Sequence, residues 1–120
     1  MIIQILLLLL IHWFADFIMQ TDKQAKGKSK NIKDLINHTI TYSIVMTIGF
    51  IMININMIPI YLFILFGVTM FISHTIIDYV TSRINSKLWS EGRTHDFFVS
   101  IGFDQFLHQL IIIGFLYLML

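Results

Sequence analysis

The chain has 120 residues, of which 57% are apolar and 12% charged, and its mean hydropathy is +0.80. Soluble domains carry about twice that share of charge, so the composition argues against a water-soluble fold and favours the bilayer as solvent. The net charge of +1 says little by itself, whereas the absence of cysteine excludes disulfides, thiolate metal sites and cysteine nucleophiles.

The first apolar segment, residues 1–20, begins MIIQILLLLLIHWFADFIMQ and contains two ionisable residues, His12 and Asp16. A hydrocarbon core is crossed by about 20 helical residues, and backbone groups in lipid must be satisfied within the segment, so we expect a transmembrane helix. The segment has neither a basic amino-terminal region nor a small-residue cleavage site, and we therefore expect it to be retained rather than removed as a signal peptide.

A lysine-rich connection follows over residues 21–34. Its lysines favour the cytoplasmic side under the positive-inside rule. A second interpretation places four of them, at spacings of three and four, on one face of a short helix against anionic lipid head groups, although Gly27 and Ser29 weaken that helix. We expect no nucleic-acid partner, because the membrane already explains this lysine run. The lysines are Lys23, Lys26, Lys28, Lys30 and Lys33, and the four on one face are Lys23, Lys26, Lys30 and Lys33.

Three further apolar segments cover residues 35–58, 60–82 and 97–120, with a second charged connection at 83–96. The turn around Asn54–Pro59 has no charge, and all eight Lys and Arg residues fall in the two charged connections. The pattern predicts an all-α protein with one domain over residues 1–120. We expect an antiparallel bundle of four transmembrane helices in the inner (cytoplasmic) membrane, with both termini outside and both charged loops inside.

Each apolar segment carries polar residues four positions apart, which places each pair on one helical face about 6 Å apart along the axis. The first and third segments run inward and have the order His-x3-Asp, whereas the fourth runs outward and has Asp-x3-His. The reversal places the aspartates at one depth and the histidines one turn deeper, so we expect all of them to converge in the cytoplasmic half of the bundle. The pairs are His12 with Asp16, His38 with Tyr42, His74 with Asp78, and Asp104 with His108.

Buried imidazole and carboxylate groups are the ligands of zinc, manganese and iron, and a cation offsets the charge of the aspartates. Polar contacts that merely hold helices together average only about 0.6 kcal/mol in membranes, against about 2.5–3.5 kcal/mol for one ionisable group at mid-membrane. We therefore expect a divalent metal site, zinc first, with one ion or two left open. The expected ligands are His12, Asp16, His38, His74, Asp78, Asp104 and His108.

Several motifs resemble those of a family of small bacterial integral membrane proteins known only as a domain of unknown function. They are HWFADFIMQTD, the His38 segment LINHTITY, HTIIDYVTSR and DQFLH. The resemblance spans most of the chain, from His12 to His108, and implies that the paired positions belong together. More loosely, the plan is similar to that of membrane-bound metal-dependent hydrolases, which place His and Asp in apolar helices.

We expect a membrane-embedded metal-dependent enzyme, a hydrolase acting on a lipid or phosphoester from the cytoplasmic leaflet. The surplus of ligands suggests that Asp16, Asp78 and Asp104 also serve the reaction, as general base or by orienting a histidine. Two alternatives stay open: a proton- or metal-ion-coupled transporter or channel, which would need a homo-oligomer, and a non-catalytic membrane subunit of a larger complex. The residues expected to contact substrate are Gln20, Tyr42 and Gln105.

Overall fold

The computed structural model describes all residues, 1–120, and contains helices and no strands, which confirms the all-α prediction. A short π-helix, η1, follows the first α-helix directly and ends before the lysine-rich connection. The elements in chain order are α1 (Ile2–Trp13), η1 (Phe14–Ile18), α2 (Asp22–Gly27), α3 (Ile32–Asn54), α4 (Ile60–Ser90) and α5 (Thr94–Met119).

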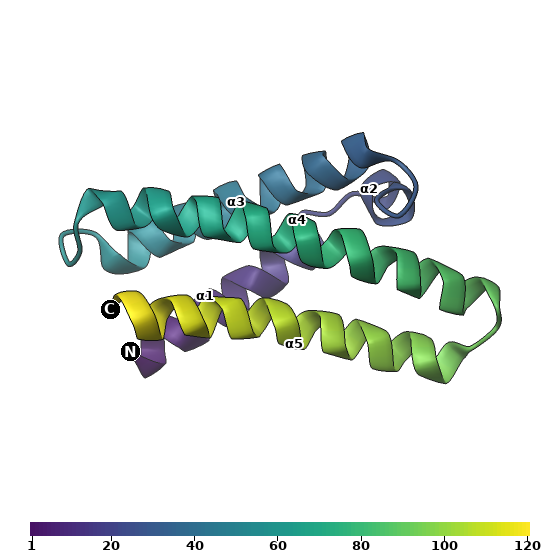
Figure 1. Ribbon diagram of the computed structural model, residues 1–120. Coiled ribbons are helices and arrows are strands. Elements are labelled where there is room, and N and C mark those ends of the chain that lie inside the picture. The colour runs from purple at the N-terminus through teal and green to yellow at the C-terminus, as the bar shows by residue number, and fades with distance from the viewer.

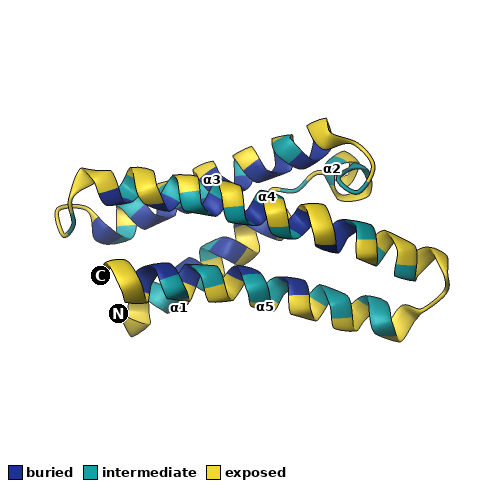
Figure 2. Cartoon of the chain, in the orientation of Figure 1, coloured by how far each residue is buried: buried dark blue, intermediate teal, exposed yellow.

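Three of these helices, α3, α4 and α5, are long and apolar enough to cross a membrane. The first apolar helix, Ile2–Ile18, is shorter. Outward-facing side chains on these helices are large and apolar: Leu10 is 61% exposed, Ile64 65% and Phe106 54%. Figure 2 shows the exposed residues on the outer faces and the buried ones turned inward. An outer surface of this kind suits lipid rather than water.

Helix α4 packs against both α3 and α5, and α1 packs against α3 and α5. In Figure 1 both termini and the α3–α4 turn lie at one end of the bundle, while α2 and the α4–α5 turn lie at the other. All eight Lys and Arg residues belong to the second end, which is called the charged end below. The helices therefore alternate in direction as the sequence pattern predicts.

Two helix ends differ from the predicted ranges. The predicted connection 83–96 is mostly helical, because α4 continues to Ser90 and α5 begins at Thr94. Residues 83–90, RINSKLWS, contain no Gly or Pro, and the turn forms only at Gly92, whose φ of 70° is in the left-handed region. The predicted connection 21–34 contains α2, which begins at a capping box in which Thr21 and Gln24 cap each other.

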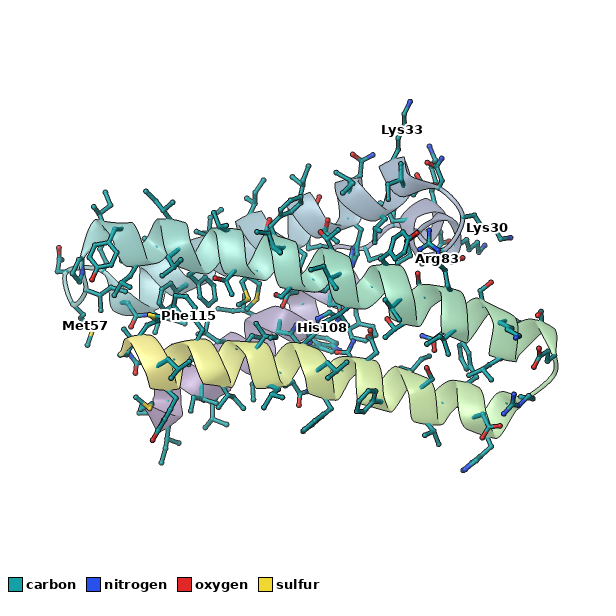
Figure 3. All side chains as sticks on the ribbon, in the orientation of Figure 1. Lys30, Lys33, Met57, Arg83, His108 and Phe115 are labelled. Atoms are coloured by element: carbon teal, nitrogen blue, oxygen red, sulfur yellow. The ribbon has the colours of Figure 1, made fainter.

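Aromatic residues fill the half of the bundle near the termini. Phe50 stacks on Phe66 with ring centroids 4.1 Å apart, and Phe115 meets Phe66 edge-on at 5.1 Å. Phe115 is labelled in Figure 3 between α4 and α5, and His108 lies further toward the charged end. The bundle thus has an apolar half next to the termini and a polar half beyond it.

Gly49 and Gly67 lie where side chains of neighbouring helices approach closely. A Cβ on Gly49 would lie 2.6 Å from Ile11 Cδ1 of α1, and one on Gly67 would lie 2.7 Å from Thr47 Oγ1 of α3. A side chain at either position would force Ile11 or Thr47 to move.

Candidate metal centre

Asp16 is presented to the bundle interior by η1. The Met19 N–H donates to the Phe14 carbonyl at 3.0 Å, a hydrogen bond over five residues that defines the wider π turn. Single π turns inside α-helices are frequent at functional sites. Asp16 is 4% exposed here and faces side chains from α3, α4 and α5.

Four buried side chains from three elements direct one ligand atom each to a common point. The Nε2 atoms of His38 and His74 are 3.1 Å apart. Asp16 Oδ1 lies 3.1 Å from His38 Nε2 and 3.3 Å from His74 Nε2. Asp78 Oδ2 lies 3.4 Å and 3.3 Å from the same two nitrogens. These residues, Asp16, His38, His74 and Asp78, are called the first ligand group below.

These separations fit a tetrahedral ion. Ligand atoms about 2.0–2.1 Å from a tetrahedral zinc ion lie about 3.3–3.4 Å from one another. The five separations just given run from 3.1 to 3.4 Å. The first ligand group therefore has the residue types, the burial and the spacing of a metal site.

A second ligand group consists of Asp16, Asp104 and His108. His108 Nε2 lies 3.5 Å from Asp104 Oδ1 and 3.1 Å from Asp78 Oδ1. Asp78 therefore directs Oδ2 toward the two histidines of the first group and Oδ1 toward His108. Asp16 belongs to both groups. Thr81, which the sequence analysis did not single out, donates from its hydroxyl to Asp104 Oδ1 at 2.5 Å.

His12 lies beside the two groups and not in either of them. The Gln105 amide Nε2 donates to Asp16 Oδ2 at 2.9 Å and to Asp104 Oδ2 at 3.1 Å. Its Oε1 is then the acceptor for His12 Nε2 at 2.9 Å. His12 Nδ1 consequently accepts from the Tyr42 hydroxyl at 2.8 Å. In this arrangement His12 positions Gln105 rather than facing the ligand atoms.

The three residues predicted to contact substrate lie in two places: Tyr42 is buried inside the bundle, whereas Gln20 and Gln105 line a cavity. Tyr42 is 1% exposed and its ring packs on that of His74, with centroids 3.8 Å apart. Gln20 lies outside both ligand groups and lines a cavity at the charged end, together with Gln105. The structure thus brings six of the predicted ligands together: Asp16, His38, His74, Asp78, Asp104 and His108.

Lys28 is the main site residue that sequence reasoning missed. Its Nζ lies 2.9 Å from Asp78 Oδ2, and its side chain is only 19% exposed. Burial opposes the charged form of Lys28, but the carboxylates of Asp78 and Asp16 outweigh burial, so its pKa is raised above the ordinary value. The Lys28 ammonium therefore lies against Asp78, a carboxylate of the first ligand group.

Residues 4–120 match a protein family described as "Protein of unknown function (DUF3307)". The chain belongs to this family. The match includes every residue of both ligand groups, so in this DUF3307 protein the whole candidate centre lies within the family domain. No curated protein and no solved structure matches the chain.

Proposed function

We propose that this DUF3307 protein is a membrane-embedded, metal-dependent hydrolase that acts on a lipid or phosphoester substrate from the cytoplasmic leaflet. The observation that carries the proposal is the set of 3.1–3.4 Å separations among four buried ligand atoms from His38, His74, Asp16 and Asp78. Buried imidazoles and carboxylates at such spacing are costly without a cation.

In this proposal the short first helix, Ile2–Ile18, is a fourth membrane crossing, since its 17 residues stand at the lower limit for a span. The positive-inside rule then places the charged end in the cytoplasm and both termini outside. A substrate reaching the ligand groups from the charged end arrives from the cytoplasmic leaflet of the inner membrane.

The two ligand groups suggest different roles. Four protein ligands complete a tetrahedral site, as in structural zinc sites, whereas three protein ligands leave a position open, as in catalytic ones. The three-residue group is also the one next to the cavity at the charged end, which Asp16, Asp104 and Gln105 line. We therefore assign the reaction to the Asp104 side of the centre, with the first group supporting it.

A divalent ion in such a site supplies Lewis acidity and lowers the pKa of water, and zinc, manganese and iron all suit nitrogen and carboxylate ligands. Hydrolysis then adds the oxygen of water to phosphorus and breaks the ester P–O bond, and the proton of the water passes to the leaving oxygen. Thr81 and Gln105 hold Asp104 with hydrogen bonds of 2.5 and 3.1 Å, which keeps its carboxylate at the side of the cavity.

A proton or ion relay is the second candidate, because hydrogen bonds run continuously from Tyr42 through His12 and Gln105 to Asp16. Phe50, Phe66 and Phe115 and their apolar neighbours fill the other half of the bundle. A relay would need a polar path through that half, so the geometry favours the enzyme.

An activity assay tests the proposal. The purified chain in lipid nanodiscs, stripped with chelator and reloaded with zinc, manganese or iron, should release water-soluble phosphate products from phospholipids. Asp104→Asn should reduce the rate by at least about 100-fold, whereas His95→Ala, an exposed histidine outside both groups, should not. Metal-loaded protein without turnover, but with pH-driven flux in proteoliposomes, would favour the relay instead.

A further inference from the structure

A cavity of about 720 Å³ lies at the charged end, between the end of η1, α2 with its following turn, α4 and α5. It is called the α2 cavity below. Asp16, Asp104 and Gln105 lie on its inner wall, so it leads directly to the second ligand group. Helix α2 packs against α3 and lies across the cavity from α5.

Three residues that line the α2 cavity carry a buried side-chain oxygen without a hydrogen-bond partner. The side-chain oxygens of Gln20, Ser82 and Asn85 are buried and have no hydrogen-bond partner, and all three residues line the cavity. Ser82 is only 7% exposed. Unpaired buried polar atoms in native structures call for a ligand or water. The amide oxygens of Gln20 and Asn85 are acceptors, so the ligand that satisfies them carries hydroxyl or N–H donors.

Positive charge lines the same cavity. Lys26, Lys28 and Lys30 all contribute to its wall. The two carboxylates on the inner wall, Asp16 and Asp104, already accept hydrogen bonds from the Gln105 amide on their Oδ2 atoms. Lysine ammonium groups are point-charge binders of phosphate. The charge of the wall therefore suits a phosphate near the lysines.

Apolar surface lies at the opening. Phe98 is 62% exposed and Trp89 61% exposed, and both line the α2 cavity with Ile101 and Phe17. The Trp89 ring lies 5.0 Å from that of Phe97. Aromatic side chains of this kind sit at the membrane interface. A hydrocarbon chain leaving the cavity beside α5 would follow apolar surface into the bilayer.

We propose that the α2 cavity binds an anionic phospholipid whose head group carries hydroxyls, as a glycerol head group does. Its phosphate lies at Lys26, Lys28 and Lys30, its hydroxyls donate to Asn85 and Gln20, and its acyl chains leave past Phe98. This inference rests on the proposed function, because it names the substrate class for the Asp104 side of the centre.

Native mass spectrometry of the purified chain with added lipid tests this binding. Phosphatidylglycerol should bind at least tenfold more tightly than phosphatidylcholine, which has no net charge, and more tightly than phosphatidic acid, which lacks the hydroxyls. Soluble glycerol phosphate should compete poorly, because it lacks the chains. Equal binding of phosphatidylglycerol and phosphatidylcholine, or glycerol phosphate binding as tightly as the lipid, would overturn the proposal.

Two matched double variants locate the site. Lys26→Gln with Lys30→Gln removes two charges from the α2 cavity and should weaken phosphatidylglycerol binding about tenfold. Lys23→Gln with Lys33→Gln removes the same charge from positions outside it, and Figure 3 shows Lys33 directed away from the bundle. Equal loss in both doubles would mean diffuse attraction to anionic lipid and would contradict a built site.

Metal content, measured on the same samples, separates this proposal from the hydrolase proposal. Selective lipid binding with no metal would leave the lipid site standing and remove the hydrolase. Bound metal without lipid selectivity would remove only the lipid site. Filling the α2 cavity with Ser82→Leu should abolish selective binding and leave the metal content unchanged, since Ser82 is in neither ligand group.

Discussion

The Nε2 atoms of His38 and His74 lie 3.1 Å apart, and each faces the same two carboxylate oxygens, Asp16 Oδ1 and Asp78 Oδ2. Two ring nitrogens that approach this closely must share either a proton or a cation. The presence of two carboxylates at the same point favours the cation, because it compensates their charge as well.

Alanine variants of the histidines should differ in zinc affinity, according to whether the histidine is a metal ligand or supports one. His38→Ala and His74→Ala each remove a ligand, and we expect zinc affinity to fall more than about 100-fold, whereas His12→Ala removes only an outer contact and should cost about 10–100-fold. Isothermal titration of metal-stripped protein with zinc measures these affinities. Equal losses for His12→Ala and His74→Ala would show that His12 belongs to the ligand set.

Asp104→Asn should abolish metal binding at the second ligand group and keep it at the first. It removes a ligand from the second group and leaves the first intact, so the metal content should fall from about two ions per chain to about one. Inductively coupled plasma mass spectrometry of the purified protein gives this ratio. Complete loss of metal in Asp104→Asn would mean that the groups bind as one unit, and an unchanged ratio would mean that the second group holds no ion.

Lys28→Met should raise the affinity for metal. The Lys28 ammonium lies 2.9 Å from Asp78 Oδ2, the same oxygen that faces the two histidines, so it competes with an ion for that carboxylate. Removing it should tighten zinc binding by up to about fivefold, the value of an ion pair worth about 1 kcal/mol. Lys33→Met is the matched control and should change nothing. Weaker zinc binding in Lys28→Met would contradict this competition.

Gly49→Leu should destabilise the bundle. A Cβ at Gly49 meets Ile11 of α1 at 2.6 Å, and the longer side chain would push α1 off α3, lowering the thermal midpoint by several degrees (roughly 1–3 kcal/mol). Gly114→Leu is the control, since a Cβ there meets nothing within 4 Å. Thermal unfolding in detergent, followed by circular dichroism, compares the two. Equal midpoints for both variants would contradict the close approach of α1 and α3.

The convergence of the site could be predicted from the sequence because helical spacing fixes which residues share a face. His74 and Asp78, and likewise Asp104 and His108, keep this spacing because α4 and α5 are uninterrupted α-helices. The same spacing predicted that His12 and Asp16 share one face. Here, however, η1 begins between the two residues, and His12 Nε2 is hydrogen-bonded to Gln105. Nothing in the local sequence FADFI signals a π turn.

Lys28 could not be distinguished from its neighbours, because five lysines in one connection are equivalent in sequence. Its place depends on how the turn after α2 packs on α3. There Gly27 lies directly against Asp34, with no room for a side chain. Gln105, expected to contact substrate, also joins three helical elements, since its amide contacts His12, Asp16 and Asp104. Tertiary contacts of this kind leave no periodic signal.

Anomalous diffraction from crystals of the purified protein, recorded at the zinc, manganese and iron edges, would locate a bound ion. We expect a peak about 2.0–2.1 Å from Asp16 Oδ1, His38 Nε2, His74 Nε2 and Asp78 Oδ2. The absence of any peak between these four atoms, in crystals grown with each metal in excess, would contradict it.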